Sequence, residues 1–424
     1  MRKAITALLT AAVAITVTAC GGDQTPAGSS KAKSSVGATS HDTPVASLLV
    51  WADATRSPVI KQMAEKFTTD TGIGVEVVER DYGKMRDDFI SQAPTGQGPD
   101  ILIGGGDWTG TFVQNGVVVP VELGDAADDF AAVALESVTY EGKVYGLPYA
   151  LENVAMFRNP ALAPTAPTTM DEALEIGKAA VAAGTAKYPF LLQIDPQGDP
   201  YHMYPIQMSF DAPVFGQSAE GGYDPKNLAM CGSEGKAFAA YLAQMGTEKV
   251  FETTMTADIA KEAFVGGQSP FVISGPWNTA DFQAAIPDVA IEPIPSAGGQ
   301  TASPFVGTQA FFISAKSENQ LAATQFVVGY LGSQEAQVEL FKAGGRPPAL
   351  TAAAQDPAVT GDAAAAAFNA VAVGGVATPN IPAMDAVWGD WANTEVAIID
   401  GKGDPATLWD EACASIQTKI EEAA

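Results

Sequence analysis

The chain has 424 residues, of which 47% are hydrophobic and 17% are charged, so it can bury a large core and is not disordered throughout. Its formal net charge of −26 argues against a nucleic-acid partner, because phosphate binding needs clustered Lys and Arg. The same acidity argues against broad contact with anionic lipid. The length predicts two or three domains.

The first residues of the chain have the pattern of an export signal. Arg2 and Lys3 precede an apolar stretch that is shorter than an ordinary membrane span, so we interpret residues 1–19 as a signal peptide. The tetrapeptide Val-Thr-Ala-Cys that ends at Cys20 resembles the lipobox of bacterial lipoproteins, in which the cysteine carries the lipid. A plain signal peptide and an uncleaved anchor are the alternatives.

A tether is expected after the signal. Residues 20–44 are rich in Gly, Ser, Thr and Ala and have no apolar periodicity. Such a segment cannot bury enough surface to order itself, so it predicts a flexible link. A lipid on Cys20 would then hold the folded part at the outer face of the cell membrane.

From residue 47 onward, strand patterns alternate with helix patterns. Short apolar runs predict strands at residues 47–51, 75–79, 100–103, 145–149 and 307–314. Apolar residues at helical spacing predict helices at residues 59–71, 85–90, 319–331 and 404–422, and an alanine-rich helix at 363–367. This alternation is typical of βαβ units, so we predict an α/β fold with a mostly parallel sheet.

Two cysteines remain in the part that is expected to fold, Cys231 and Cys413. An even pair in an exported chain is consistent with a disulfide. Sequence spacing does not show that the two residues approach each other. A disulfide and two buried thiols therefore both stay open.

Sequence motifs for metal or nucleotide chemistry are missing. The chain has only two histidines, His41 and His202, so clusters with His/Cys spacing are absent and only a carboxylate metal site stays open. There is no Gly-x-Ser-x-Gly motif and no P-loop, and the glycines at 104, 106 and 110 match a dinucleotide loop only loosely. We therefore expect no metal, no cofactor and no enzymatic activity.

Carboxylates and aromatic residues follow several predicted strands, where open α/β sheets bind their ligands. The polar candidates are Asp53, Arg56, Asp107 and Glu152. The aromatic candidates are Trp108, Tyr201, Trp277, Trp388 and Trp391. Sugars need this mixture, because charged groups bind hydroxyls and the C–H faces of a pyranose lie against aromatic rings.

Not every aromatic residue is a candidate. Trp51 and Trp409 are expected in the core, and Trp391, which shares a helix face with Trp388, is also able to pack inside. Trp277 is the strongest platform, because the preceding Gly-Pro dipeptide places it in a turn. His202 is either a structural residue or a ligand contact.

Five segments resemble the maltose/maltodextrin-binding proteins of ABC importers. They are Leu49–Trp51, Lys66–Gly72, Thr95–Leu102, Ser274–Trp277 and Pro379–Met384. The resemblance runs in register from about residue 47 to the C-terminus. The lipobox and the Asp-Trp-Thr-Gly run at residues 107–110 are more similar to Gram-positive members.

The resemblance implies a two-lobe, periplasmic-binding-protein-like fold of type II, with three crossing segments and a sugar between the lobes. Lobe 1 would comprise residues 45–151 and 306–355, and lobe 2 residues 152–305 and 356–424. By position, it implies polar contacts from Asp53, Arg56, Asp107 and Glu152, and stacking by Tyr201, Trp277 and Trp388. The role of Trp108 follows from the Gram-positive pattern.

Two departures from the family pattern remove side-chain volume. Gly104–Gly106 and Gly389 stand where relatives have bulkier residues, so we expect a roomier or differently shaped cleft.

The expected function is an exported, lipid-anchored monomer that captures a maltodextrin-type α-glucoside and delivers it to the permease subunits of an ABC importer. Trehalose, cyclodextrin, acarbose-like and β-linked sugars are alternative ligands. The rival functions are a secreted glycosidase using Asp107 and Glu152, and an adhesive lipoprotein without a small ligand.

Overall fold

The computed structural model describes residues 47–217 and 222–423. The chain divides into two units, Met1–Asp42 and Thr43–Ala424. The described residues all belong to the second unit. The predicted signal peptide, the tether, Cys20 and His41 lie outside the described residues. Within the described ranges, no helix is both long and apolar enough to cross a membrane.

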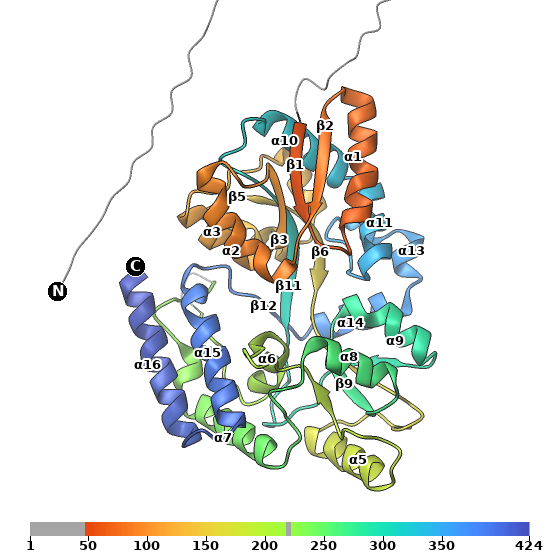
Figure 1. Ribbon diagram of the computed structural model, residues 1–424, viewed down its shortest axis with the longest axis vertical. Coiled ribbons are helices and arrows are strands. Elements are labelled where there is room, and N and C mark those ends of the chain that lie inside the picture. Colours follow the sequence, from red (N-terminus) through yellow and green to blue (C-terminus); the bar gives the residue numbers. More distant parts are fainter. Residues whose placement is uncertain (1–46, 218–221, 424) are drawn as a thin grey trace, which may run out of the picture. The chain divides into compact units, whose positions relative to one another are not determined.

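Six strands form the first sheet (Figure 1). In order across the sheet they are β12 (Val376–Ala377), β11 (Phe305–Ile313), β3 (Ile101–Gly105), β1 (Ser47–Ala52) and β2 (Gly74–Glu79), with β6 (Gly146–Glu152) also pairing with β11. β1 is parallel to β2 and β3, as predicted, whereas β11 is antiparallel to β3 and β6. β11 is parallel to β12. The predicted mostly parallel arrangement therefore holds in this sheet except at the pairings of β11 with β3 and β6, because β11 enters from the second half of the chain and runs opposite to these two strands.

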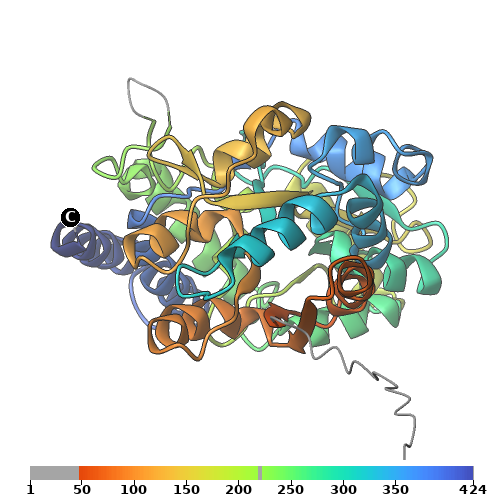
Figure 2. The same ribbon diagram turned by 90° about the horizontal axis from the view of Figure 1, so that it is seen from above.

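Helices cover both faces of the first sheet. One face packs against α1 (Ser57–Thr71), α10 (Gln320–Phe326) and α11 (Gln334–Gly344), and the other against α2 (Tyr82–Gln92) and α3 (Thr109–Gln114). Figure 2 shows α1 nearly end-on beside the strands. As predicted, α1 ends at Gly72, whose positive φ of 75° suits a residue without a side chain. The expected helix at 319–331 is α10 continued by a π-helix over Val327–Leu331.

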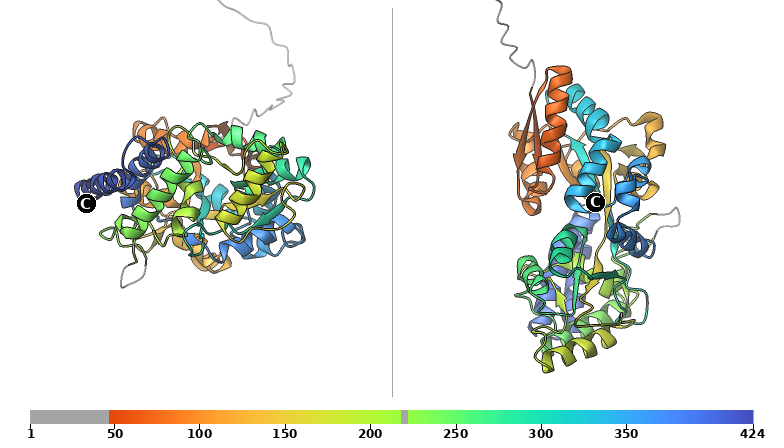
Figure 3. Two further views of the ribbon diagram at one scale, coloured as in Figure 1. Left: turned by 90° about the horizontal axis from the view of Figure 1, so that it is seen from below. Right: turned by 90° about the vertical axis from the view of Figure 1, so that its right-hand side faces the viewer.

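Four strands form the second sheet, in the order β10 (Ala290–Glu292), β7 (Ala155–Arg158), β9 (Phe271–Ser274) and β8 (Leu191–Leu192). Successive residues of β7 point to opposite faces, so Met156 enters one core and Phe157 the other. The first core is covered by α5 (Met170–Ala182), α6 (Pro200–Met208), α7 (Ser233–Thr247), α15 (Ala383–Ile399) and α16 (Pro405–Ala423). The second is covered by α8 (Ala257–Val265), α9 (Thr279–Ala285) and α14 (Ala363–Ala372). Figure 3 shows α5 at the end of this unit farthest from α1.

Short elements connect the longer ones. They are α4 (Ala132–Ser137), α12 (Thr351–Ala354), α13 (Pro357–Thr360), the hairpin of β4 (Thr139–Tyr140) and β5 (Lys143–Val144), and 3₁₀ helices over Ala93–Thr95, Gly106–Trp108, Gly124–Asp129, Ala229–Cys231 and Pro276–Asn278.

The chain leaves the first sheet after β6, returns between β10 and β11, and leaves again between α11, which packs on the first sheet, and α14, which packs on the second. After α14, the short strand β12 pairs with the start of β11 before the chain continues into α15. β6 and β11 pair from Gly307 to Phe312 at this junction (Figure 1). The lobe boundaries expected at 151/152, 305/306 and 355/356 stay predictions of where the hinge bends.

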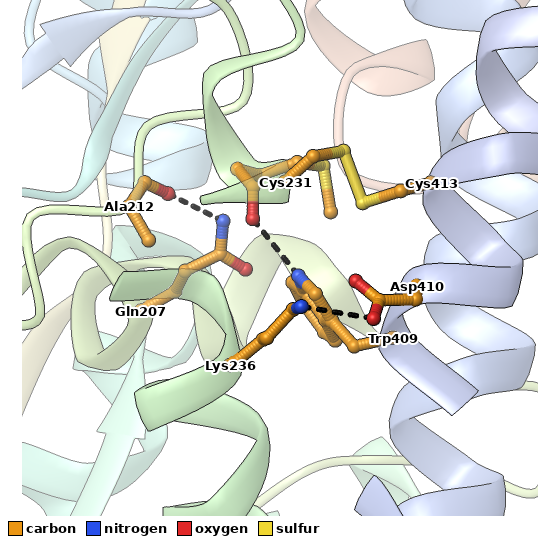
Figure 4. The surroundings of a disulfide bond; sticks show 8 residues. Gln207, Ala212, Cys231, Lys236, Trp409, Asp410 and Cys413 are labelled. Carbon is orange, nitrogen blue, oxygen red and sulfur yellow. Dashed lines mark hydrogen bonds and ion pairs between the residues drawn. A yellow bond between two sulfur atoms is a disulfide. The ribbon is translucent and has the colours of Figure 1, made fainter. Parts of the chain in front are cut away.

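Cys231 and Cys413 form a disulfide, which settles the alternative left open by the sequence. The bond ties the 3₁₀ helix Ala229–Cys231 to α16 (Figure 4). Beside it, the Trp409 indole donates a hydrogen bond of 2.8 Å to the carbonyl of Met230. Trp409 and Trp51 are both buried, as predicted.

Candidate functional site

A cleft of about 880 Å³ lies where the strands of both sheets end. It receives residues that follow β1, β2, β3 and β9, together with residues of β6, β11, α6 and α15. This volume falls in the range of sites that hold small molecules. Both halves of the unit therefore contribute to one binding surface.

Arg56 and Asp53 form an ion pair in the wall that the first sheet supplies. Arg56 is only 4% exposed, donates to the hydroxyl of Tyr149, and lies with its guanidinium carbon 5.0 Å from the centre of the Tyr82 ring. Burial acts to lower the pKa of Arg56, but Tyr149 and Asp53 outweigh it and raise that pKa above its ordinary value. Arg56 is therefore a permanent cation that is paired with Asp53.

Glu152 holds a second charge pair at the end of β6. One carboxylate oxygen accepts from the amide of Gln309 at 2.7 Å, and the other pairs with Arg346. Burial acts to raise the pKa of Glu152, but Arg346 and Arg56 outweigh it and hold that pKa below its usual range. The network continues to Tyr82, whose hydroxyl donates to Gln309 at 3.0 Å.

Asp107 and Trp108 follow β3 in a 3₁₀ helix, and both line the cleft. Burial raises the pKa of Asp107 to about 6, and the positive charge of Arg86 only partly offsets that effect. The Trp108 ring tilts against Tyr82, with the ring centres 5.2 Å apart. This wall thus combines an aromatic surface with a carboxyl group that titrates near neutral pH.

The glycines before Asp107 do not enlarge the cleft. A side-chain carbon on Gly104 would lie 2.5 Å from the Trp108 ring, one on Gly105 would lie 2.3 Å from Asp107, and one on Gly106 would lie 1.8 Å from Ser137. Neighbouring side chains therefore fill the volume that these glycines leave, which corrects the expectation of a roomier cleft here. Gly389 is exposed, and a side-chain carbon there would contact nothing.

Aromatic rings dominate the wall that the second sheet supplies. Tyr201 comes from the first turn of α6, Trp277 from the turn after β9, and Trp388 from α15. Gly275 allows the Trp277 ring to fold back over the backbone, since a side-chain carbon on Gly275 would lie 2.1 Å from that ring. The guanidinium of Arg346 lies 5.4 Å from the centre of the same ring, so Trp277 contacts a residue from the opposite wall.

Trp391 is placed differently from the other aromatic candidates. It is 0% exposed, belongs to the core of the second sheet and is not among the residues that line the cleft. Its ring stacks on Trp388 at 5.6 Å and so supports Trp388 from behind. The expectation that Trp391 contacts ligand is therefore corrected, because its ring packs in the core against Tyr204 and Trp388.

His202 lines the cleft next to Tyr201. Its ring meets Trp277 edge to face, with ring centres 5.8 Å apart, and its Nδ1 atom lies 2.9 Å from a carboxylate oxygen of Asp199. Burial acts to raise the pKa of Asp199, but His202 and Gln193 outweigh it and lower that pKa. Asp199 also caps α6 by accepting from the backbone N–H of His202.

Several cleft residues were not identified from the sequence: Tyr82, Gln193, Gln309 and Arg346. A signal existed for two of them. Gln309 interrupts an apolar strand and is buried, and Arg346 follows two glycines and precedes two prolines in a loop. Their partners are far away in the sequence, and Arg346 is 194 residues from Glu152.

This arrangement suits an uncharged polar ligand with apolar faces. The rings of Tyr201, Trp277 and Trp388 offer flat surfaces, and the charge pairs offer donors and acceptors to hydroxyl groups. Among residues 47–217 and 222–423, no group of three or more His, Cys, Asp or Glu side chains is placed to hold a metal ion.

Comparison with known proteins places the chain among binding proteins. The galactooligosaccharide-binding protein of Bacillus subtilis (strain 168) is 28% identical over 99% of this chain and 98% of its own length. A maltooligosaccharide ABC transporter solute-binding lipoprotein of Streptococcus pneumoniae serotype 4 is 25% identical over 91% of each chain.

A solved structure supports the fold. The crystal structure of a cyclo/maltodextrin-binding protein complexed with maltotetraose superimposes with a TM-score of 0.73 at 29% identity, covering 88% of this chain and 97% of that one. The two-lobe type II fold that the resemblance implied is thus confirmed. The sequence profile of bacterial extracellular solute-binding proteins matches residues 62–367. The chain therefore belongs to the bacterial extracellular solute-binding protein family.

Proposed function

We propose that this protein is the substrate-binding component of an ABC carbohydrate importer and that it binds a maltodextrin-type α-glucoside in the cleft. The observation that carries the proposal is the pairing of three aromatic rings on one wall with the Asp53–Arg56 and Glu152–Arg346 pairs on the other. A pyranose needs both kinds of surface at once. In this proposal Trp108 adds a ring, and Asp107 adds an acceptor.

The names of the relatives support this ligand class. The Streptococcus pneumoniae relative is a maltooligosaccharide-binding lipoprotein, and the structural neighbour holds maltotetraose. The Bacillus subtilis relative is named for galactooligosaccharides, so β-linked sugars belong in any test panel.

Calorimetric titration tests the proposal directly. We expect maltotriose and maltotetraose to bind more tightly than trehalose, cyclodextrin, an acarbose-like sugar or a galactooligosaccharide. If one of these other sugars bound more tightly, the ligand class would be that sugar's class and not maltodextrins. If no sugar of the panel bound, the proposal would be refuted. Incubation with maltodextrin should yield no shorter products, whereas their appearance would favour the rival glycosidase.

Binding is proposed to close the two lobes over the sugar. A ligand that contacts both walls binds better to a closed form and shifts the population toward it. Reversing a strongly open-biased equilibrium needs a preference of about 5 kcal/mol, which a few charge-assisted hydrogen bonds of about 1.5–3 kcal/mol each can supply. Small-angle scattering with and without maltotriose should show a smaller radius of gyration in the bound protein.

The remaining parts of the proposal concern location and partners. We infer that residues 1–19 are removed, that Cys20 is lipidated and that residues 20–44 tether the binding unit to the outer face of the membrane. The closed, monomeric protein then docks on the permease, and other subunits hydrolyse ATP. Labelling of growing cells with a radioactive fatty acid should mark the wild-type protein and should not mark a Cys20→Ala variant.

A further inference from the structure

We infer that His202 is a specificity-determining contact whose Nε2 atom accepts a hydrogen bond from a sugar hydroxyl in the occupied cleft. This inference rests on the proposed function and assigns one further residue to its site. It also decides between the structural role and the contact role that the sequence left open for His202.

The first observation is the position of the ring. His202 lines the cleft although it is only 5% exposed, and it lies edge to face against both Trp277 and Tyr201. A sugar unit stacked on Trp277 therefore has its rim beside the imidazole. The rim of a pyranose carries the hydroxyl groups, and their orientation distinguishes one sugar from another.

The second observation is that only one of the two ring nitrogens is satisfied. Nδ1 lies 2.9 Å and 3.0 Å from the two carboxylate oxygens of Asp199. Nε2 is buried and has no hydrogen-bond partner among the described residues. Leaving a buried polar atom without a partner is unfavourable, so a ligand hydroxyl at this place would recover that cost.

Asp199 decides which nitrogen carries the hydrogen. An ionised carboxylate only accepts hydrogen bonds, so Nδ1 must donate, and the neutral ring then presents Nε2 as an acceptor. Gln193, which also lines the cleft, donates to the same carboxylate and fixes it. Asp199 does not itself line the cleft, but it holds the side chains of His202 and Gln193, which do. It is thus a positioning residue for these two side chains.

This acceptor differs from the others in the cleft. The carboxylates of Asp53 and Glu152 are already engaged by Arg56 and Arg346. In the neutral ring Nε2 is an acceptor without charge, and the ring is flanked by Tyr201 and Trp277, so Nε2 accepts from a hydroxyl that points along one direction only. A sugar whose hydroxyl points the other way at this position would leave both groups unpaired and bind more weakly.

The most direct test uses nitrogen NMR of the imidazole. The sequence has only two histidines, so a His41→Asn variant gives the signals of His202 alone. We expect the free protein to show Nε2 as the unprotonated nitrogen, and saturating maltotriose to shift the Nε2 signal while Nδ1 changes little. Binding of maltotriose, followed by calorimetry, with an unmoved Nε2 signal would overturn the inference and leave the proposed function intact.

Substitutions provide the second test. His202→Phe keeps a flat ring for the contacts with Trp277 and Tyr201 but removes the acceptor, so maltotriose should bind about tenfold more weakly, a change of about 1.4 kcal/mol. Asp199→Asn keeps a good helix cap but replaces one carboxylate oxygen by an NH₂ donor, so Nδ1 is no longer held as the donor and binding should weaken similarly. The double variant should lose little more than either single variant, because both changes remove one interaction.

The two proposals fail in distinguishable ways. Wild-type affinity in His202→Phe, with an unchanged thermal midpoint, would mean that the ring only packs and would overturn the inference alone. A wild-type protein that binds none of the saccharides would overturn both.

Discussion

At the scale of single residues, the sequence predicts which polar and aromatic residues line the cleft better than it predicts which of them pair with one another. Asp53, Asp107 and Glu152 were identifiable because they lie at or just after the ends of strands, and all three line the cleft. The partner of Glu152 was not identifiable, because Arg346 reaches it from a loop 194 residues away. Local patterns give the position of a residue along a strand, whereas pairing across the cleft depends on the tertiary fold.

Trp277→Ala should weaken maltotriose binding at least about tenfold, since ring stacking and the apolar contact area are lost together. Trp277→Phe keeps a smaller ring and should lose less. Titration calorimetry measures both, and circular dichroism checks that each variant is folded. Equal affinity in Trp277→Ala and the wild type would show that the sugar stacks elsewhere.

Asp107 should make binding depend on pH. Burial raises its pKa to about 6, so the ionised carboxylate, which accepts more strongly from hydroxyls, prevails only above that pH. Affinity should therefore fall as the pH is lowered through about 6. Because the folded pKa lies above that of the unfolded chain, the contribution of Asp107 to stability runs in the opposite direction and decreases as the pH rises through the same range.

Titrations at about pH 5 and about pH 8 measure the change in affinity, on either side of the raised pKa. Asp107→Asn cannot ionise, so its affinity should be flat over that range. If the affinity of Asp107→Asn followed the same pH profile as that of the wild type, another group would be responsible for the pH dependence.

At the scale of elements, the strands and helices that the sequence predicts are present, but their directions and breaks are not all predictable. The run at 307–314 was identifiable as a strand, yet its antiparallel direction depends on the path of the chain through the second half. The π-helix over Val327–Leu331 interrupts a regular apolar pattern, so periodicity alone did not indicate it. Pairing of Cys231 with Cys413 likewise depends on α16 packing beside α7.

The disulfide should contribute to stability more than to binding. It closes a loop with a sequence separation of 182 residues and lies away from the residues that line the cleft. The double variant Cys231→Ala/Cys413→Ala should lose about 2–5 kcal/mol of unfolding free energy and keep its sugar affinity. Denaturant unfolding measures this, and a reductant should shift the midpoint of the wild type only. An unchanged midpoint in the double variant would contradict the prediction.

At the scale of the whole binding unit, an ion pair joins the half built on the first sheet to the half built on the second sheet. Neither of its residues lines the cleft. Arg86 of α2 pairs with Asp385 in the first turn of α15, and Asp385 also accepts from the hydroxyl of Thr111 in α3. α2 and α3 pack on the first sheet and α15 packs on the second. These contacts stabilise the arrangement in which the two walls face each other.

Asp385→Ala should therefore favour a more open form. A partly exposed ion pair contributes at most about 1 kcal/mol, so maltotriose affinity should fall by no more than about fivefold. Scattering should show a larger radius of gyration for the free variant than for the free wild type. Glu339→Ala, which removes the exposed pair with Lys342 inside α11, is the matched control and should change neither quantity.

The charge pairs of the cleft have a consequence for the ionic conditions under which the protein works. Asp53 is neutralised by Arg56 and Glu152 by Arg346 before any sugar arrives. A sugar carries no charge, so its entry displaces no counterions, and these short, largely buried pairs are only weakly screened by dissolved salt. Maltotriose affinity should thus stay nearly constant between dilute buffer and molar salt, which calorimetry at two ionic strengths can measure, and uptake would then tolerate large changes in the salinity of the surroundings.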